Sequence, residues 1–367
     1  MISNLKRRAL FFKNSLLRSL SLKTGLVLAQ PTFVSLAVAN RCCLRCQQCD
    51  LWQKESPRTC LSLDQQKKAI LEFKNWLGPF KLNLTGGEPF LSRSILSVIS
   101  YASGLGIETF VNSNGYPINP GLAAGIVRSG LGHLSISLDS HRIKIHDEIR
   151  GVKGAFERAR KAIDLVQKFR GNRGKPVLSL TTVVMEKNLE DLAELVFLTR
   201  RLGLNGINFQ PLQSKYSFGF QKYSSVWYRR HPLWPKNSPE VNRVIDRLIE
   251  LKKAGWPIYN PLWELKRFKA YFYNPNCFNN EPCLVGLSNL SVDIGGEVRL
   301  CFSLPPIGNI LREGPAAIWR GKEAAKRREQ IRKCTKNCRI LLCNRKLGPG
   351  QILKEAFFRQ FRLKIKT

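Results

Sequence analysis

Three cysteines near the start of the chain have the spacing of a compact metal site. Three residues separate Cys42 from Cys46, and two separate Cys46 from Cys49. Thiolates this close in sequence can converge on one small object, whereas four-thiolate zinc sites usually come as two separated pairs, and no second pair lies nearby. Three thiolates suit a four-iron cluster that leaves one iron open for another ligand. We therefore expect such a cluster here.

The neighbouring Cys43 leaves alternatives open. Cys43, Cys46 and Cys49 are also spaced like part of a ferredoxin sequence, although the fourth cysteine and its following proline are lacking. A zinc site or an electron-transfer cluster is therefore the alternative to the open cluster. The chain has only four histidines, so a histidine-based zinc site or catalytic triad is poorly supported, and His146 needs no catalytic role.

Two further stretches place polar groups where a ligand could bind. In the turn Gly86-Gly87-Glu88 the glycines permit close backbone approach, and the carboxylate can receive an ammonium group. Ser113 and Ser137 stand at the ends of apolar, β-branched runs. Polar residues at the carboxyl ends of barrel strands are where ligands bind in such folds.

The segment Asn40–Cys49 resembles the signature of the radical SAM superfamily, whose cluster motif follows the first strand of a barrel. The resemblance implies that the open iron binds S-adenosylmethionine (SAM) and that the glycine-rich turn holds its methionine amino group. Ser137 would then contact the ribose or carboxylate of SAM, and Arg150 would pair with the carboxylate. The cofactor-binding residues implied in this way are Gly86, Gly87, Glu88, Ser113, Ser137, Arg150 and Gln210.

The match has one departure, and two of its residues have simpler interpretations. An aromatic residue commonly precedes the third cysteine of the family, and here Gln48 does. Helix capping is the alternative role for Ser137, and an ordinary surface charge is the alternative for Arg150. Gln210, at the end of the sixth expected strand, is a weaker candidate for the ribose or adenine end of SAM.

The resemblance also implies a reaction. An external electron donor such as flavodoxin or ferredoxin drives reductive cleavage of SAM to a 5′-deoxyadenosyl radical, which abstracts a hydrogen atom from an unactivated C–H bond. The substrate could be a peptide or protein, or a lipid or sugar small molecule. Peptide-modifying relatives often carry a leader-binding domain, and with roughly 30 residues before the first expected strand we expect no room for one here.

Six more cysteines lie in the last quarter of the chain, where they resemble the auxiliary-cluster extension called SPASM, or its shortened form, twitch. The region offers too few cysteines for two clusters, so we expect one auxiliary four-iron cluster. Cys283 and Cys301 are its surest ligands, and a structural zinc site is the alternative. The remaining ligands would come from Cys334, Cys338 and Cys343, with Cys277 as a competitor.

The elements that must position these residues alternate between short β-branched runs and longer helical patterns. Six β-then-α units in series favour a parallel α/β sheet that forms a partial (β/α)6 TIM-like barrel, followed by a small cysteine-rich extension. Ser62 with Gln65 predicts a capping box, and Asn188 is expected to cap a later helix. The expected strands are 33–39, 81–84, 108–111, 134–138, 178–185 and 206–210.

The same patterns divide the chain into parts. A helix is expected over residues 239–254, and a hairpin with its turn at Gly295-Gly296 follows. We expect a basic amphipathic segment (1–30), the radical SAM partial barrel (31–212), a linker and helical segment (213–270), the auxiliary-cluster domain (271–345) and a basic tail (346–367).

Charge is the unusual feature of the composition. The chain has 60 Lys and Arg against 26 Asp and Glu, a formal charge of +34, and so large an excess destabilises a compact state by self-repulsion. A polyanionic partner is therefore expected, and nucleic acid, an anionic membrane face or an acidic substrate would each serve. The rival to an enzyme is a non-catalytic, metal-stabilised protein that binds nucleic acid.

The compartment is expected to be the cytoplasm. Basic residues interrupt every apolar run near the start, so no signal peptide is present, and eleven cysteines then favour metal over disulfides. No stretch of about 18 apolar residues could span a bilayer. Residues 3–22 could form a basic amphipathic helix that lies peripherally on the inner membrane face; a solvated arm or a helix packed on the body is the alternative.

Overall fold

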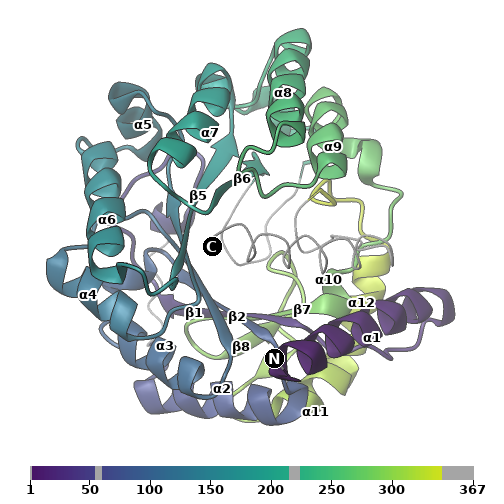
Figure 1. Cartoon of the computed structure of the whole chain (residues 1–367). Helices are drawn as coiled ribbons and strands as arrows, with labels where there is room; N and C mark the ends of the chain where they lie inside the picture. The colour runs from purple at the N-terminus through teal and green to yellow at the C-terminus, as the bar shows by residue number, and fades with distance from the viewer. Residues whose placement is uncertain (1, 54–59, 215–223, 341–367) are drawn as a thin grey trace.

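The computed structural model describes residues 2–53, 60–214 and 224–340, and it has the α/β architecture that the sequence predicts (Figure 1). Six parallel strands follow one another along the chain and pair in that order. They are β1 (Phe33–Ala39), β2 (Lys81–Gly86), β3 (Glu108–Ser113), β4 (His133–Ser137), β5 (Val177–Val184) and β6 (Gly206–Pro211).

Helices join these strands and lie around the outside of the sheet (Figure 1). Parallel neighbours need such long crossovers, and the apolar side of each helix covers the sheet. The connecting helices are α2 (Leu63–Leu77), α3 (Ile95–Gly104), α4 (Pro120–Arg128), α5 (Ile143–Arg150), α6 (Ala155–Arg170) and α7 (Leu192–Arg201).

The sheet is open, which confirms a partial rather than a closed barrel. Its order is β6-β5-β4-β3-β2-β1-β7-β8-β9, so β6 and β9 are the two edges. β7 (Asn289–Val292) pairs in parallel with β1, with Phe33 opposite Asn289. The cysteine-rich extension therefore continues the sheet of the barrel.

The predicted hairpin is present at this junction. β7 and β8 (Glu297–Arg299) are antiparallel, and their turn contains Gly296 with a φ of 85°. The carboxylate of Asp293 accepts hydrogen bonds from the backbone N–H groups of Gly295 and Glu297, both at 3.0 Å. An aspartate at the start of a turn with glycine in the left-handed region is a common hairpin arrangement.

The other elements lie before and after the six-unit core. No helix within the described residues is long and apolar enough to span a membrane. The remaining elements are α1 (Ile2–Thr24), α8 (Ser238–Lys253), α9 (Leu262–Tyr273), α10 (Val285–Ser288), β9 (Gly308–Asn309), α11 (Pro315–Arg320) and α12 (Lys322–Arg332).

The sequence predicts two helix caps, and the structure confirms one and contradicts the other. Ser62 and Gln65 form the predicted capping box, with hydrogen bonds of 2.8 and 3.2 Å between their side chains and backbone N–H groups. The cap predicted at Asn188 is wrong. Asn188 lies inside a 3-10 turn (Glu186–Asp191), and its amide donates to the carbonyl oxygens of Asp139 and Val183 at the ends of two strands.

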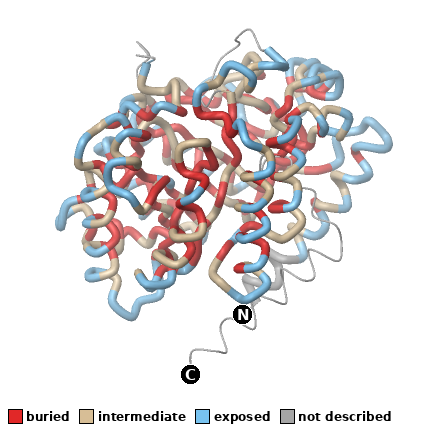
Figure 2. Tube along the Cα trace, turned by 90° about the horizontal axis from the view of Figure 1, so that it is seen from above, coloured by how far each residue is buried: buried red, intermediate tan, exposed pale blue. Residues whose placement is uncertain are grey.

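The core fills the space between the sheet and its helices (Figure 2). Leu82 and Leu84 on β2 and Leu134 and Ile136 on β4 are almost fully buried, in the alternation of a strand that packs one face on a core. Burying each such side chain stabilises the fold by about 1.5–3 kcal/mol. This rigid sheet fixes the positions of the loops at its carboxyl edge.

Candidate metal and cofactor site

The first three candidate ligands lie on one loop, directly after β1. Two neighbouring segments hold the backbone of this loop. From the glycine-rich turn after β2, the N–H groups of Gly87 and Glu88 donate to the carbonyl oxygens of Ala39 and Arg41, at 3.1 and 2.8 Å. The cysteine loop and the turn therefore lie at the same end of the sheet, as the sequence predicts.

The end of α5 holds the other side of the loop. The N–H groups of Arg45 and Gln47 donate to the carbonyl oxygens of Arg150 and Ile149, at 3.1 and 2.9 Å. Gly151 ends the helix in the left-handed region, and a Cβ there would stand 2.4 Å from the Arg45 carbonyl oxygen. Only glycine allows this approach without displacing the loop.

The turn after β2 requires glycine for the same reason. A Cβ on Gly86 would stand 2.1 Å from the carbonyl oxygen of Ala39, and a Cβ on Gly87 would stand 2.1 Å from that of Arg41. Such distances are far inside van der Waals contact. The two glycines therefore let the turn lie directly against the cysteine loop.

Glu88 is the carboxylate that this turn carries, and it is almost fully buried. It accepts hydrogen bonds from the Ser113 hydroxyl and from the backbone N–H groups of Phe90 and Asn114, at 2.8, 3.1 and 2.8 Å. Burial raises the pKa of Glu88 to about 7, although these three donors oppose the rise. Glu88 and Ser113 thus connect the ends of β2 and β3 beside the cysteine loop.

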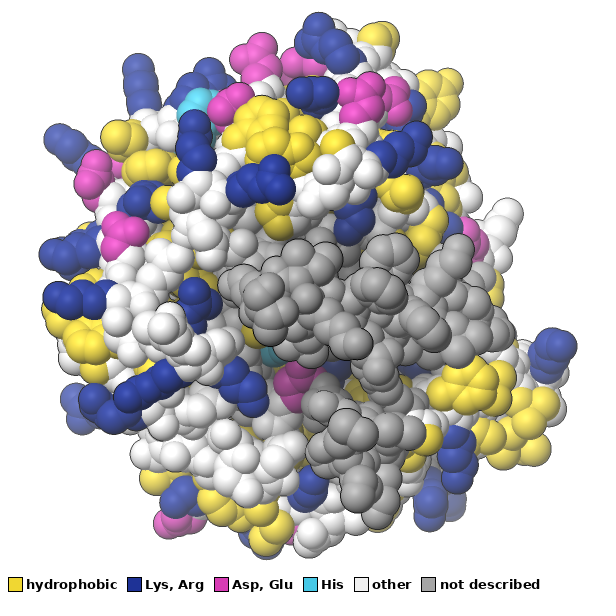
Figure 3. Space-filling view, in the orientation of Figure 1, with side chains coloured by type: hydrophobic (Ala, Val, Ile, Leu, Met, Phe, Trp, Pro, Cys, Tyr) yellow, Lys and Arg dark blue, Asp and Glu magenta, His cyan; other side chains and the backbone are white. Residues whose placement is uncertain are grey.

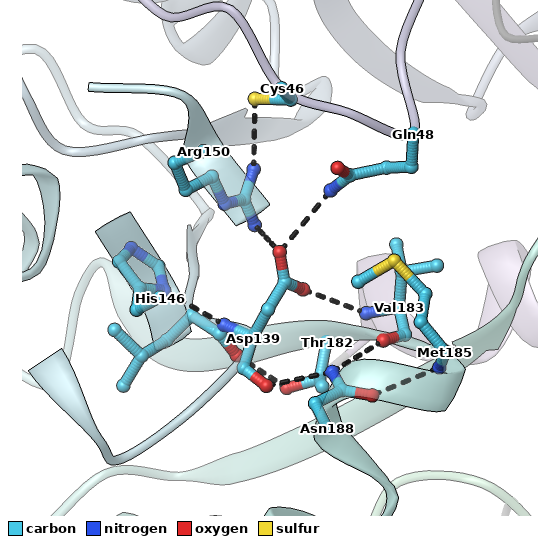
Figure 4. Close-up of polar contacts among 10 residues, drawn as sticks. Cys46, Gln48, Asp139, His146, Arg150, Thr182, Val183, Met185 and Asn188 are labelled. Carbon is cyan, nitrogen blue, oxygen red and sulfur yellow. Dashed lines mark hydrogen bonds and ion pairs between the residues drawn. The ribbon is translucent and has the colours of Figure 1, made fainter. Parts of the chain in front are cut away.

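A buried ion pair lies beside Cys46 of the loop (Figure 4). Nη2 of Arg150 is 2.8 Å from Oδ2 of Asp139, and Nη1 donates toward the sulfur of Cys46 at 3.8 Å. The amide of Gln48 donates to the same Asp139 oxygen at 3.2 Å, and the N–H of Val183 donates to the other oxygen at 3.0 Å. Arg150 is therefore neither exposed nor isolated, and Gln48 is packed against it.

The polar atoms of this group are not all satisfied. Oε1 of Gln48 and Nε of Arg150 are buried and lack hydrogen-bond partners within the described residues. A buried acceptor and a buried donor without partners cost free energy unless another molecule pairs with them. Their position next to Cys46 fits a site that is completed by a polar cofactor.

His146 supports the same group from α5. Its Nδ1 accepts a hydrogen bond from the N–H of Asp139 at 3.1 Å, so the ring is neutral, with its proton on Nε2. Burial holds the pKa of His146 well below its usual value, and the charge of Arg150 adds to this effect. His146 thus positions the backbone of Asp139.

The three thiols share one small apolar environment. Cys42, Cys46 and Cys49 pack around Leu44 and Ala155, and burial raises the pKa of Cys46, and that of Cys49 to about 11. No group of three or more Cys, His, Asp or Glu side chains in the described ranges is arranged to hold a metal ion. The thiols are thus gathered on one loop without already converging on one point.

The donor set nevertheless suits an iron-sulfur cluster. Apolar side chains flank the thiols, thiolates are the ligands that such clusters take, and the loop is fixed on both sides. Nε1 of Trp52 donates to the Cys46 carbonyl oxygen at 3.1 Å, which fixes the loop further. Asn114 lies over the neighbouring thiols, with its amide nitrogen 3.7 Å from Cys42 and 3.5 Å from Cys43.

The last two cofactor candidates stand at strand ends on the same sheet. Ser137 ends β4 opposite Thr181 of β5, and Gln210 of β6 stands opposite Val183 of β5. Both side chains are half-buried. Val183 is also the residue that donates to Asp139, so Gln210 lies one strand away from the ion pair. Their roles toward a ligand stay predictions.

Four cysteines of the C-terminal extension form a second group. Burial raises the pKa of Cys301 to about 11 and that of Cys338 to about 12, and the nearby thiols of Cys283 and Cys334 contribute to both shifts. The four thiols are therefore within electrostatic range of one another, although here too the described residues are not already arranged to hold a metal ion. Arg339 stands beside them, where its Nη2 donates to the Cys334 carbonyl oxygen at 2.6 Å.

The other two C-terminal candidates differ from these four. Cys277 is exposed, and the charged groups that act on it are Arg267 and Glu281 rather than any of the other cysteines. Cys343 lies outside the described residues. The structure thus places Cys277 apart from the second group.

Three residues of the first site were not among the sequence candidates. Asp139 stands two residues after the candidate Ser137, and Asn114 directly follows the candidate Ser113, so the strand-end argument could have included both. Gln48 was visible only as a departure from the family pattern. Its partner could not be found from sequence, because Asp139 is 91 residues away along the chain.

Comparison with known proteins supplies two family matches. Residues 36–199 match the family model described as the radical SAM superfamily, and residues 283–344 match the SPASM model, described as an iron-sulfur cluster-binding domain. The first match contains the cysteine loop, the glycine-rich turn and the ion pair. The second contains Cys283, Cys301, Cys334 and Cys338.

Curated relatives cover much of the chain. It is 28% identical over 299 residues to an AdoMet-dependent heme synthase of Oleidesulfovibrio alaskensis, which is 79% of this chain and 74% of that protein. A protein of the same name from Methanosarcina barkeri is 25% identical over 304 residues, 80% of this chain and 83% of that protein. A mycofactocin maturase of Mycolicibacterium smegmatis is 29% identical over 174 residues, 47% and 43% of the two chains.

Solved structures confirm the fold. Streptococcus suis SuiB bound to S-adenosylmethionine superposes with a TM-score of 0.64 at 14% identity, over 89% of this chain and 77% of that chain. The structure of anSMEcpe with bound AdoMet and a peptide gives a TM-score of 0.58 at 16% identity, over 90% and 98% of the two chains. At these identities the likeness shows the fold alone.

Proposed function

Since the chain belongs to the radical SAM superfamily and carries a C-terminal SPASM domain, we propose that Cys42, Cys46 and Cys49 hold its SAM-binding [4Fe-4S] cluster. The observation that carries this assignment is the double attachment of the cysteine loop, to the glycine-rich turn on one side and to the end of α5 on the other. The chain is a radical SAM enzyme, so the alternative of a non-catalytic nucleic-acid-binding protein is set aside.

The residues around the loop would bind and orient SAM. Gly86 and Gly87 would hold the turn directly against the cysteine loop, and Glu88 would provide the carboxylate that receives the amino group. Arg150 would meet the SAM carboxylate through Nε, which has no partner within the described residues, while Asp139 holds the other end of the guanidinium. Ser113 acts through Glu88 rather than on the ligand itself.

The strand-end residues complete the proposed site. Ser137 would contact the ribose or carboxylate of SAM, and Gln210 the ribose or adenine end. Both stand beside β5, whose Val183 contacts the ion pair. Oε1 of Gln48, whose amide nitrogen donates to Asp139, is a further acceptor without a partner in the described part of the chain.

We assign the auxiliary cluster of the SPASM domain to Cys283, Cys301, Cys334 and Cys338. These four act on one another electrostatically, and four thiolates are the full ligand set of such a cluster. Arg339 is buried beside them and offsets the negative charge that a thiolate-bound cluster carries. Cys277 and Cys343 are not needed in this assignment.

When bound, the first cluster and SAM supply a 5′-deoxyadenosyl radical that takes a hydrogen atom from an unactivated C–H bond. The chain's own part is to hold SAM, to exclude water around the apolar thiol environment and to position one substrate hydrogen. The substrate is proposed to be a peptide or protein, or a lipid or sugar small molecule. A structure of similar fold solved with a bound precursor peptide supports the peptide candidate.

The proposed partners follow from the chemistry and the charge. An external electron donor such as flavodoxin or ferredoxin would supply the electron. Lys and Arg outnumber acidic side chains over the face in Figure 3, which suits an acidic donor, an acidic substrate or an anionic membrane. Nucleic acid as the substrate of a radical enzyme would also suit this charge.

The test is to remove one proposed ligand and measure SAM cleavage. In anaerobically reconstituted and reduced protein, Cys46→Ala should abolish formation of 5′-deoxyadenosine. Cys60→Ala is the matched control, because Cys60 is half-buried and outside both cysteine groups, and it should retain the activity. Persistent cleavage in the Cys46→Ala protein would overturn the assignment.

A further inference from the structure

Helix α1 turns a row of large apolar side chains away from the protein. Phe12, Leu16 and Leu20 are 37%, 49% and 45% exposed, and their spacing of four residues places them along one face. Figure 3 shows hydrophobic side chains gathered at the lower right of the molecule, where Figure 1 places α1. An isolated exposed leucine needs no explanation, but a continuous row on one helix does.

The orientation of the helix is fixed by its opposite face. Asn14 and Ser21 are nearly fully buried there. The side-chain oxygen of Asn14 accepts from the N–H of Gln30, and the Ser21 hydroxyl accepts from the N–H of Leu28, both at 3.0 Å. Polar contacts therefore hold α1 on the segment that leads to β1, and they direct the apolar row outward.

A second group of apolar side chains continues this row past the end of the helix. The chain turns at Gly25, whose φ is 75°, and then exposes Leu26 to 63%. Val27 and Leu28 are 39% and 38% exposed, and Leu22 in the last turn of α1 is 39% exposed. We call Phe12, Leu16, Leu20, Leu22 and residues 26–28 the α1 surface.

The charges within the α1 segment itself are all of one sign. The helix carries six basic residues and no acidic one, and Asp50 is the first acidic residue in the chain. Lys13 and Lys23 are exposed beside the apolar row. Apolar side chains in a row with flanking lysines are the composition of helices that lie in the plane of an anionic lipid interface.

We propose that the α1 surface binds the headgroup region of an anionic lipid bilayer. Other occupants fit the same residues less well. A second copy of the chain would bring two strongly basic helices together, and their charges would repel. A nucleic acid would be held by basic and aromatic side chains, and it gives no reason to expose Leu16, Leu20 and Leu26 in one surface. The proposal is independent of the SAM chemistry, because α1 contains none of the proposed ligands.

The test measures co-sedimentation of the full-length, anaerobically reconstituted protein with lipid vesicles. Vesicles of phosphatidylcholine with about a quarter phosphatidylglycerol supply the anionic surface, and pure phosphatidylcholine is the comparison. We expect partition to the anionic vesicles at low ionic strength and a marked loss of it at high ionic strength. Deoxyadenosine formation in the same preparations reports separately on the proposed function.

Two pairs of substitutions separate this surface from exposed apolar residues in general. Leu16→Ser with Leu20→Ser should lower the partition coefficient by at least about tenfold, since two large apolar side chains leave the interface. Ile143→Ser with Phe169→Ser is the matched control. These residues are 49% and 37% exposed, and they lie on α5 and α6, on the opposite side of the molecule in Figure 1. The control protein should bind the vesicles as the parent protein does.

The charge is tested with the apolar row intact. Lys13→Gln with Lys23→Gln should weaken binding to anionic vesicles and leave the weak binding to phosphatidylcholine unchanged. The proposal is overturned if the parent protein does not bind anionic vesicles at low ionic strength, or if the Leu16→Ser, Leu20→Ser protein binds them equally well. It is also overturned if that variant instead loses only affinity for an RNA oligonucleotide, or only dissociates a dimer.

Discussion

The buried pair of Asp139 and Arg150 gives the sharpest prediction for the stability of the site. Asp139 has no exposed surface, and the Arg150 side chain is 9% exposed, so neither charge has water as an alternative partner. At 2.8 Å and an effective dielectric constant of about 20, their attraction is about 6 kcal/mol before desolvation is counted. Much of that attraction offsets the desolvation of the two charges.

Asp139→Asn removes the charge and keeps the size of the side chain. The guanidinium of Arg150 is then buried without its counter-charge, and its Nε has no partner within the described residues to compensate. Breaking a buried ion pair from one side costs about 3–5 kcal/mol, so we expect the free energy of unfolding to fall by about that amount. The amide of Gln48 also loses its charged acceptor.

Urea denaturation of the anaerobically reconstituted protein, followed by tryptophan fluorescence, measures this loss. Glu250→Gln is the control, because its pair with Arg247 is more than half exposed and should contribute at most about 0.5 kcal/mol. Adding Arg150→Met to Asp139→Asn should recover part of the loss, since no uncompensated charge remains. The reasoning is refuted if Asp139→Asn costs as little as the control, or if the second substitution only adds to the damage.

Three other changes have defined outcomes. Gly87→Ala places a Cβ 2.1 Å from a backbone oxygen of the cysteine loop and should abolish deoxyadenosine formation, whereas Gly104→Ala, with nothing within 4 Å, should retain it. His146→Gln should lower the free energy of unfolding at neutral pH. In urea titrations, the difference between the free energies of unfolding of the wild-type and variant proteins should shrink by about 1.4 kcal/mol per pH unit below the ordinary histidine pKa. Cys338→Ala should lower bound iron from about eight to about four per chain, and Cys277→Ala should leave it unchanged, as iron and sulfide analysis would show.

The sign of the pH effect follows from the burial of His146. Because burial holds its pKa well below 6.5, the unfolded chain binds a proton below that pH and the folded protein does not. The stability that His146 contributes is therefore complete above pH 6.5 and is lost as the pH falls below it. The glutamine substitute does not titrate, so a pH-independent difference between the two proteins would contradict the neutral, buried ring.

The other two changes are equally open to refutation. A Gly87→Ala protein that still makes deoxyadenosine would show that the turn need not lie against the cysteine loop. Wild-type iron content in Cys338→Ala, or a loss of iron in Cys277→Ala, would show that the auxiliary ligand set is assigned wrongly.

The sequence predicts the barrel well because its signals are local. Each β-branched run sets one strand by its own composition, and the observed strands begin within one residue of the expected positions. The capping box at Ser62 and the hairpin turn at Gly296 also depend on residues a few positions apart. Continuation of the sheet from β1 into β7 could not be predicted in this way, because it joins residues 256 positions apart, Phe33 and Asn289.

The same contrast between local and long-range signals applies to the candidate site. Spacing within one loop marked the three cysteines, and a short motif marked Gly86 to Glu88. The other residues of the site are brought together by contacts between distant parts of the chain. Arg150 meets Cys46 across 104 positions, so sequence alone left a surface charge as the alternative interpretation. The cap assigned to Asn188 failed because its amide satisfies strand-end carbonyls of Asp139 and Val183, a tertiary role that no local pattern reveals.

The central claim is that three cysteines on the first loop hold a cluster with one vacant iron, while four in the SPASM domain hold a second cluster. Electron paramagnetic resonance of the reduced protein, with and without SAM, tests it most directly when combined with iron and sulfide counts. The account predicts about eight irons per chain and a spectrum that SAM changes. In a Cys42→Ala, Cys46→Ala, Cys49→Ala protein it predicts about four irons and a spectrum that SAM leaves unchanged. A SAM-induced change that persists in this variant would contradict the account.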